Sequence, residues 1–291
     1  MLLRFDGARW QEVALPEGWE PLRPGGLRPV GLVRDGQGRV VLLGLAEGPR
    51  LHFARRVHEV WESWGSQDLG LPKAQIVLLH ALVDGAGGRW VALARRDAQG
   101  DLRGLGVLHL ALGAERARFL GPEGAAPLPG LDAGPALPSG SVTALAEAAG
   151  ALWIGTRSGL LRVVGEEVTL FDENAGMDSE SIQGIAAGPA GAPWIRTSEG
   201  LAQLEGERWR SLKGAAAPAI AAPEAALALG PGGELWVSAA PGLLRGGPAG
   251  WRIVRAAAAL EGRPVQQVLF PKDGGPWVVQ EHRLLLLREL D

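Results

Sequence analysis

A repeat of 41 or 42 residues is the feature that most limits how this chain folds. Three segments align in its C-terminal half: GALWIGTRSGLLRV from Gly150, GAPWIRTSEGLAQL from Gly191 and GELWVSAAPGLLRG from Gly233. The tryptophans of the repeat fall 41, 42 and 41 residues apart, at Trp153, Trp194, Trp236 and Trp277. A period of this length predicts an array of one supersecondary unit, in which each copy packs on its neighbours.

Each unit reads as four short strands. In the unit that begins at Ser141, the alternating segment SVTALAE is followed by LWIGT, LLRVV and EVTLF, with glycine-bearing turns between them. Short alternating runs separated by such turns are typical of β-hairpins. The glycines and β-branched runs disfavour the paired amphipathic helices of a helical solenoid. The expected fold class is therefore all-β, a β-propeller of four-stranded blades.

Six second-strand positions indicate the number of blades: Val40, Trp90, Trp153, Trp194, Trp236 and Trp277. We expect about six blades. Seven is the alternative, because LLRF near the N-terminus and LLLLREL near the C-terminus both resemble third strands. The N-terminal RWQEV is expected to supply the outer strand of the last blade, which closes the ring and removes a free sheet edge. The whole chain, residues 1–291, is expected to form a single propeller domain.

A stretch rich in proline, glycine and alanine, residues 121–140, interrupts the repeat in the first half of the chain. Structureless loops of this length are uncommon in compact domains and are either functional or mobile. We expect a loop insertion that serves as a mobile linker.

Composition excludes several classes of function. The chain of 291 residues has no cysteine, which removes thiol catalysis, disulfides and thiolate metal sites. Its formal charge is −3, so the basic surface that nucleic-acid binding requires is not expected. No apolar run reaches the length of a membrane span, and the N-terminus does not read as a signal peptide. We expect a cytoplasmic protein if the chain is complete, and a periplasmic one if it is part of a longer sensor protein.

The segment SVTALAEAAGALWIGTRSGLLRVVGEEVTLFDENAGMDSESIQGIAA (Ser141–Ala187) resembles the two-component regulator propeller repeats of bacterial sensor proteins. The resemblance lies in the hydrophobic strand, the LWIGT and GL segments, and the late phenylalanine followed by an Asn/Gly loop. It implies a ligand-binding propeller. The family has no shared catalytic residues, so the resemblance assigns none to this chain.

Candidate binding residues lie in the turns between the second and third strands of each unit. Turns on a rigid scaffold commonly carry binding function. The candidates are Arg95, Arg96, Asp97, Arg157, Glu199, Glu281, His282 and Arg283. Trp61 and Trp64 in VWESWG are candidates for an exposed aromatic patch.

Motifs for catalysis are not found. The sequence has no nucleophile elbow or P-loop, and its five histidines lack the spacing of a catalytic zinc site. No cofactor or metal is expected, and we favour a non-enzymatic binding or scaffolding protein that recognises a partner protein or a small polar ligand. One alternative is a lyase or hydrolase that uses Glu281 and His282 as acid and base. Another is a structural subunit of a larger bacterial assembly. Nucleic acid and membrane are not expected as partners.

Overall fold

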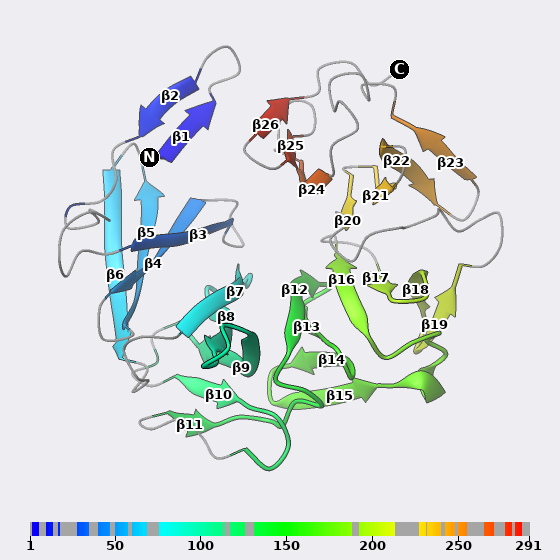
Figure 1. Cartoon of the computed structure of the whole chain (residues 1–291), viewed down its shortest axis with the longest axis horizontal. Helices are drawn as coiled ribbons and strands as arrows, with labels where there is room; N and C mark the ends of the chain where they lie inside the picture. Colours follow the sequence, from blue (N-terminus) through cyan, green and yellow to red (C-terminus); the bar gives the residue numbers. More distant parts are fainter. Residues whose placement is uncertain are drawn as a thin grey trace. The chain divides into compact units, whose positions relative to one another are not determined.

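In the computed structural model, the regular secondary structure of the described residues is almost entirely β-strand (Figure 1). The structure describes residues 2–5, 10–13, 17, 28–34, 40–46, 50–57, 60–68, 76–112, 114, 117–125, 131–187, 192–212, 227–230, 232–239, 242–247, 250–254, 265–270, 277–280 and 283–286. The one helical element in these ranges is a 3-10 turn, η1 (Glu173–Ala175), and no helix there is long and apolar enough to cross a membrane.

The strands in chain order are β1 (Leu2–Phe5), β2 (Trp10–Val13), β3 (Arg28–Arg34), β4 (Val40–Ala46), β5 (Arg50–Val57), β6 (Val60–Asp68), β7 (Ile76–Val83), β8 (Arg89–Arg96), β9 (Leu102–Leu110), β10 (Arg118–Leu120), β11 (Asp132–Ala133), β12 (Val142–Ala148), β13 (Ala151–Thr156), β14 (Gly159–Val164), β15 (Glu167–Phe171), β16 (Ile182–Ala186), β17 (Trp194–Thr197), β18 (Leu201–Glu205), β19 (Arg208–Ser211), β20 (Leu227–Leu229), β21 (Leu235–Ala239), β22 (Gly242–Gly247), β23 (Gly250–Ile253), β24 (Val265–Leu269), β25 (Trp277–Gln280) and β26 (Arg283–Leu286).

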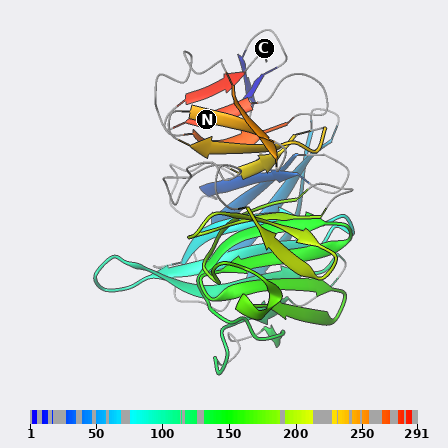
Figure 2. The ribbon, with the colours of Figure 1, turned by 90° about the vertical axis from the view of Figure 1, so that its right-hand side faces the viewer.

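The strands form sheets in which sequence neighbours pair. A hairpin, β1–β2, is followed by the sheets β3–β6, β7–β11, β12–β15, β16–β19, β20–β23 and β24–β26. All six predicted second-strand positions lie in the second strand of their sheet, which confirms how the repeat was divided. The turn between β8 and β9 projects from its sheet as a narrow loop (Figure 2).

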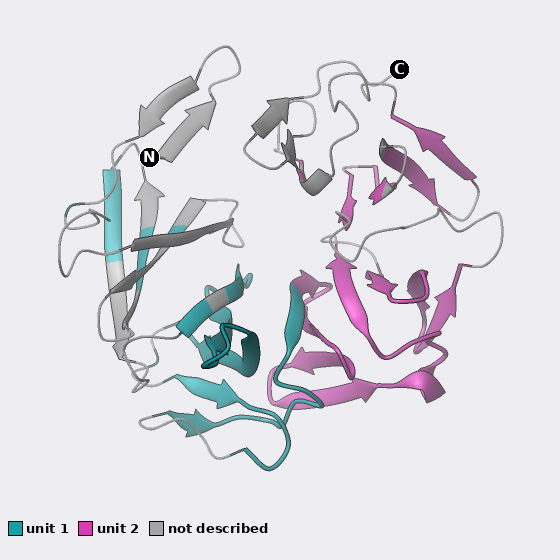
Figure 3. Ribbon diagram, in the orientation of Figure 1, with its two compact units in different colours: residues 1–145 teal, residues 146–291 magenta. Residues whose placement is uncertain are grey.

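The chain divides into two compact units, Met1–Leu145 and Ala146–Asp291 (Figure 3). The division falls within β12, a strand of the sheet β12–β15. The single propeller domain expected from the sequence stays a prediction.

The core of the second unit is built around the predicted tryptophans. Trp153, Trp194 and Trp236 are at most 4% exposed, as expected for anchors that bury large apolar area. Trp153 packs against Phe171 and lies edge-on to Trp209, with ring centroids 5.6 and 5.8 Å apart. Such tilted and edge-to-face contacts are the preferred geometries of aromatic pairs.

The core of the first unit lies along the sheet β7–β11. Val91, Leu93 and Leu108 are buried there together with Phe53 of the sheet β3–β6. The guanidinium of Arg89 lies 4.8 Å from the centroid of the Phe53 ring, a cation–π distance. This contact accounts for a charged side chain that is only 5% exposed.

The stretch 121–140, expected as a loop insertion that serves as a mobile linker, is described at residues 121–125 and 131–140. Its described parts are tied to the sheet: β11 pairs in parallel with β10, and Pro122 forms a parallel bridge with Leu137 (Figure 1). A Cβ added to Gly104 of β9 would lie 2.2 Å from the carbonyl oxygen of Gly140, so the end of the stretch packs directly on the sheet backbone. Two of its residues, Asp132 and Ala133, form the short fifth strand of this sheet, and the role of the stretch as a linker stays a prediction.

Ring closure by the N-terminal strand is not among the described pairings. The strand that contains RWQEV, β2, pairs with β1, with Leu2 opposite Val13 and Phe5 opposite Trp10. The last sheet contains three described strands, β24, β25 and β26. Closure and the number of blades therefore stay predictions.

Candidate functional site

The turn between β8 and β9 brings together three of the predicted binding residues. Arg95 and Arg96 end β8, and Asp97 opens a five-residue connection to β9. Both arginines are exposed, and Arg95 lies opposite Arg103 in the strand register. Gly100 adopts a φ of +90°, which favours glycine, and this allows the chain to reverse within the turn.

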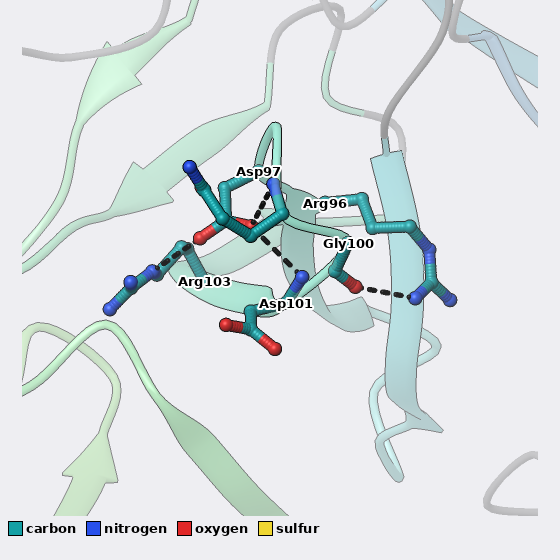
Figure 4. Close-up of polar contacts among 6 residues, drawn as sticks. Arg96, Asp97, Gly100, Asp101 and Arg103 are labelled. Atoms are coloured by element: carbon teal, nitrogen blue, oxygen red, sulfur yellow. Dashed lines mark hydrogen bonds and ion pairs between the residues drawn. The ribbon is translucent and has the colours of Figure 1, made fainter.

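The carboxylate of Asp97 organises this turn (Figure 4). Its Oδ1 accepts hydrogen bonds from the backbone N–H groups of Gln99 and Asp101 at 3.1 and 2.9 Å. Its Oδ2 accepts a hydrogen bond from Nε of Arg103 at 2.9 Å. An Asp side chain that bonds backbone groups ahead of it mimics a backbone turn, and here it orders the tip before any partner binds.

The charges of the turn reinforce its shape. The hydrogen bond from Arg103 holds the pKa of Asp97 below its ordinary value, and the same bond raises the pKa of Arg103. The Arg96 guanidinium donates to the carbonyl oxygen of Gly100 at 2.8 Å. Leu102, at the start of β9, is 46% exposed beside these charges. The tip therefore presents fixed arginine side chains next to an apolar residue.

In the second unit, two turns between second and third strands, β13–β14 and β17–β18, are braced by buried threonines. Thr156 donates through its hydroxyl to the carbonyl oxygen of Gly159 at 2.8 Å and accepts from the Ser158 N–H at 3.1 Å. Thr197 accepts from the N–H groups of Glu199 and Gly200 at 3.1 and 3.2 Å. Both threonines are at most 4% exposed.

The predicted residues Arg157 and Glu199 lie exposed in these two turns, and residues 179–181 connect the turns. The Gly159 N–H donates to the carbonyl oxygen of Glu180 at 2.9 Å, and the Ser198 N–H donates to the carbonyl oxygen of Ser181 at 3.2 Å. The hydroxyl groups of Ser179 and Ser198 lie 2.9 Å apart. The turns of Arg157 and Glu199 are therefore both held by the segment 179–181.

The bracing threonines were missed from the sequence, although a signal was present. TRSG and TSEG place a threonine at the end of the second strand, three residues before a glycine. A hydroxyl there satisfies turn N–H groups in the manner of an ST-turn. Ser238, in SAAPG of the next sheet, is also buried at 8% exposure.

Arg196 was also missed. It lies in β17 and is 3% exposed, and burial lowers its pKa to about 10. Its Nη2 donates to the carbonyl oxygen of Gln183 at 3.1 Å. In the preceding repeat a glycine, Gly155, takes the same position, so the repeat pattern gives no sign of this arginine.

The remaining candidates are placed only in part. Glu281 and His282 lie outside the described residues, and Arg283 begins β26 opposite Gln280. Trp61 is half-buried against Leu42 and Ala54. Trp64 pairs in register with Phe53. The aromatic patch and the site at Glu281 and His282 stay predictions.

Within the described ranges, no group of three or more His, Asp or Glu side chains is placed to hold a metal ion. The turns instead offer exposed charges on tips that side-chain hydrogen bonds keep in shape.

Comparison with known proteins shows the fold. No protein-family model and no curated protein match the sequence. Among solved structures, PorZ of Porphyromonas gingivalis, a surface component of the type-IX secretion system, is 16% identical with a TM-score of 0.58. The extracellular domain of a protein assigned to the hybrid two-component systems of B. thetaiotaomicron is 12% identical with a TM-score of 0.52. YCF48 bound to D1 peptide is 13% identical with a TM-score of 0.52.

The fold is propeller-like. The likeness to two-component regulator propeller domains is thereby confirmed at the level of the fold. The three alignments cover 95%, 93% and 92% of this chain, but 40%, 34% and 81% of PorZ, the sensor domain and YCF48. This chain thus spans less than half the length of the first two structures.

Proposed function

We propose that this protein is a non-enzymatic binding propeller that recognises a partner protein through the turns between its second and third strands. The observation that carries the proposal is the ordered β8–β9 tip, in which one carboxylate accepts three hydrogen bonds. A turn ordered in advance loses little conformational freedom on binding, so more of the contact energy appears as affinity. Small-molecule sites are concave, whereas this turn projects from its sheet, which favours a protein partner (Figure 2).

The proposal includes a ring of six blades closed by β2. In such a ring the second-to-third turns share one face, so that several predicted residues serve one surface. The residues assigned to it are Arg95, Arg96, Asp97, Arg157, Glu199, Glu281, His282 and Arg283.

The structural neighbours support a role in recognition or assembly outside the cytoplasm. One neighbour is an extracellular domain, one is a bacterial surface component, and one is bound to a peptide. We propose a periplasmic or cell-surface location for this chain on that basis. The cytoplasmic option has no support among these neighbours. The lyase or hydrolase alternative depends on Glu281 and His282 and gains no support from the described residues.

The charge of the β8–β9 tip indicates the chemistry of the partner. Arginines outnumber aspartates there, with Arg95, Arg96 and Arg103 against Asp97 and Asp101. Complementary charge mainly speeds association and adds specificity, and salt screens it. We therefore propose an acidic surface on the partner, bound more weakly as ionic strength rises.

The test compares two double variants in affinity capture from the native host, followed by binding measurements with the purified partner. Arg95→Ala with Arg96→Ala removes two of the three tip arginines. Arg208→Ala with Arg210→Ala is the matched control, because it removes two exposed arginines from the outer strand β19. Arginine is enriched among the interface residues whose truncation costs about 1 kcal/mol or more, so the tip variant should bind about tenfold more weakly while the control binds like the wild type. Equal affinity of the tip variant and the control for every captured protein would overturn the proposal.

A further inference from the structure

The outer edge of β10 carries a segment of the same chain as if it were a bound peptide. We call residues 131–137, with the sequence LDAGPAL, the strap. Within it, β11 pairs in parallel with β10, with Asp132 opposite Arg118 and Ala133 opposite Phe119. The strap thus covers a sheet edge whose N–H and C=O groups would otherwise be open to another strand.

Main-chain hydrogen bonds hold the strap to this edge. The Asp132 N–H donates to the carbonyl oxygen of Ala117 at 3.1 Å, and the Gly134 N–H donates to that of Phe119 at 2.9 Å. Further along, the Leu137 N–H donates to the carbonyl oxygen of Gly121 at 2.8 Å. Alternate backbone bonds along an extended segment are the pattern by which peptides add to sheet edges.

Two leucines anchor the strap, one at each end. Leu131 is 7% exposed and packs in the core cluster with Ala117 and Phe119. Leu137 is 1% exposed. Asp132 and Ala133, between the anchors, are exposed. Backbone bonds give affinity and side-chain pockets give specificity in strand addition, and the strap has both.

Charge adds a third element of selectivity. Trp90, His109, Arg118 and Asp132 form one row across β8, β9, β10 and β11, because each is in register with the next. Residues opposite one another on neighbouring strands share a face of the sheet, where opposite charges are favourable and like charges are unfavourable. An acidic residue directly after the first leucine therefore fits this edge.

We propose that the outer edge of β10 is an acceptor for an extended acidic peptide with a leucine on each side, and that the strap occupies this acceptor in cis. The partner is a protein segment with the pattern of the strap itself: leucine, an acidic residue, and a second leucine six positions after the first. The inference is independent of the proposed function, since it concerns the outer edge of β10 and not the turn between β8 and β9.

The strap is built so that such a segment can replace it. Only Asp132 and Ala133 form the β11 ladder, and parallel pairing is slightly weaker per residue than antiparallel pairing. Pro135 lies inside the strap and Pro138 follows it, and proline offers no N–H to a ladder. A partner segment would make the same contacts and would compete with the strap for the same edge.

The first test uses a released variant, Leu131→Asp with Leu137→Asp, and a fluorescent peptide of residues 130–140, with binding read by anisotropy. The released variant should bind the peptide about tenfold or more tightly than the intact chain does, because the intact chain presents the free edge only part of the time. A peptide with Asp132→Lys should bind more weakly. A chain that also carries Arg118→Glu should prefer a peptide with Asp132→Arg, and this charge exchange separates recognition from non-specific adhesion.

The second test uses the intact chain, so it does not depend on the released variant being folded. Hydrogen exchange should show the N–H groups of Asp132, Gly134 and Leu137 exchanging about tenfold or more faster than those of β8 and β9, because the strap opens locally. The proposal is overturned if these amides exchange as slowly as the core amides of β8 and β9. It is also overturned if the released variant is folded but binds the peptide no more tightly than the intact chain does. A dimer of the intact chain that disappears with Leu131→Asp would also overturn it, by assigning the edge to the strap of a second copy.

Discussion

The sheets β7–β11 and β12–β15 follow the same strand plan but hold it with different polar groups. In the first sheet, Trp90 donates its indole N–H to the carboxylate of Asp84 at 2.8 Å. Its ring stacks on that of His109, with the ring centroids 3.5 Å apart. In the second sheet, Trp153 occupies the same second-strand position. Its indole N–H has no hydrogen-bond partner among the described residues, and its ring is fixed by Phe171 and Trp209.

The turns that follow these tryptophans differ in the same way. In the sheet β7–β11, the carboxylate of Asp97 binds the backbone of the β8–β9 turn. In the sheet β12–β15, the buried hydroxyl of Thr156 binds the shorter turn before β14. The repeat therefore requires a large apolar ring and a braced turn, and either a carboxylate or a hydroxyl can supply the bracing.

The largest effect is expected from removing the indole N–H groups. Trp90→Phe and Trp153→Phe lose similar volume, but only Trp90→Phe loses a hydrogen bond to a carboxylate, whereas Trp153→Phe removes an N–H without a described partner. Hydrogen bonds to charged groups contribute about 1.5–3 kcal/mol, so Trp90→Phe should destabilise the protein by about 2 kcal/mol more than Trp153→Phe. Urea unfolding followed by circular dichroism measures this difference.

Trp236→Phe is the control for that comparison. Trp236 donates its indole N–H to Oε1 of Glu234 at 3.0 Å and should therefore behave like Trp90. Equal losses of unfolding free energy in all three variants would show that the loss of ring volume, and not the loss of a hydrogen bond, sets the cost of these substitutions.

A smaller effect is expected from the bracing hydroxyls. Thr156→Val keeps the shape of the side chain but loses a hydrogen bond of 2.8 Å to Gly159, so it should cost about 1 kcal/mol of unfolding free energy. Thr197→Val should cost a similar amount, because its donated bond to Gly200 is longer, at 3.5 Å, but it also loses the two bonds accepted from the N–H groups of Glu199 and Gly200. Thr169→Val, at an exposed position of β15, should change the unfolding free energy by less than about 0.5 kcal/mol. The comparison of turns fails if the exposed control costs as much as Thr156→Val.

The smallest effect is expected from pH and distinguishes the two kinds of bracing. The hydrogen bond from Arg103 lowers the pKa of Asp97, so Asp97 contributes stability above its unfolded pKa of about 4, and this contribution is lost as the pH falls through the lower folded value. The difference in melting temperature between the wild type and Asp97→Asn should therefore shrink between pH 6 and pH values below about 4. The difference between the wild type and Thr156→Val should stay constant over that range, since a hydroxyl does not titrate there. A parallel decline in both differences would contradict the assignment.

The predictions from sequence that succeeded concern local patterns. SVTALAE became β12, EVTLF became β15, and the tryptophan of LWIGT lies buried in the second strand of its sheet. Alternating hydrophobic residues and turn glycines are patterns of a few residues, and the same patterns recur in each repeat along the chain. Arg95, Arg96 and Asp97 lie in one ordered turn between the second and third strands, and their role in binding stays a prediction.

The features that sequence reasoning missed depend on partners far apart in the sequence. The stretch 121–140 looked like a linker because its proline and glycine content carries no strand signal, yet β10 supplies the hydrogen bonds that make β11 a strand. Segment 179–181 links the turns of Arg157 and Glu199 through bonds that span about half a repeat, which local pattern does not contain.

The sequence by itself determined the all-β class, the four-strand unit and the tryptophan positions, because period and alternation follow from side-chain direction along a strand. Only the tertiary structure decided which polar group each buried ring and each turn received, and whether a proline-rich segment was loop or strand. Those outcomes depend on hydrogen-bond partners and close backbone contacts that arise after distant segments come together. Gly104 against Gly140 and Asp132 opposite Arg118 are two such pairs.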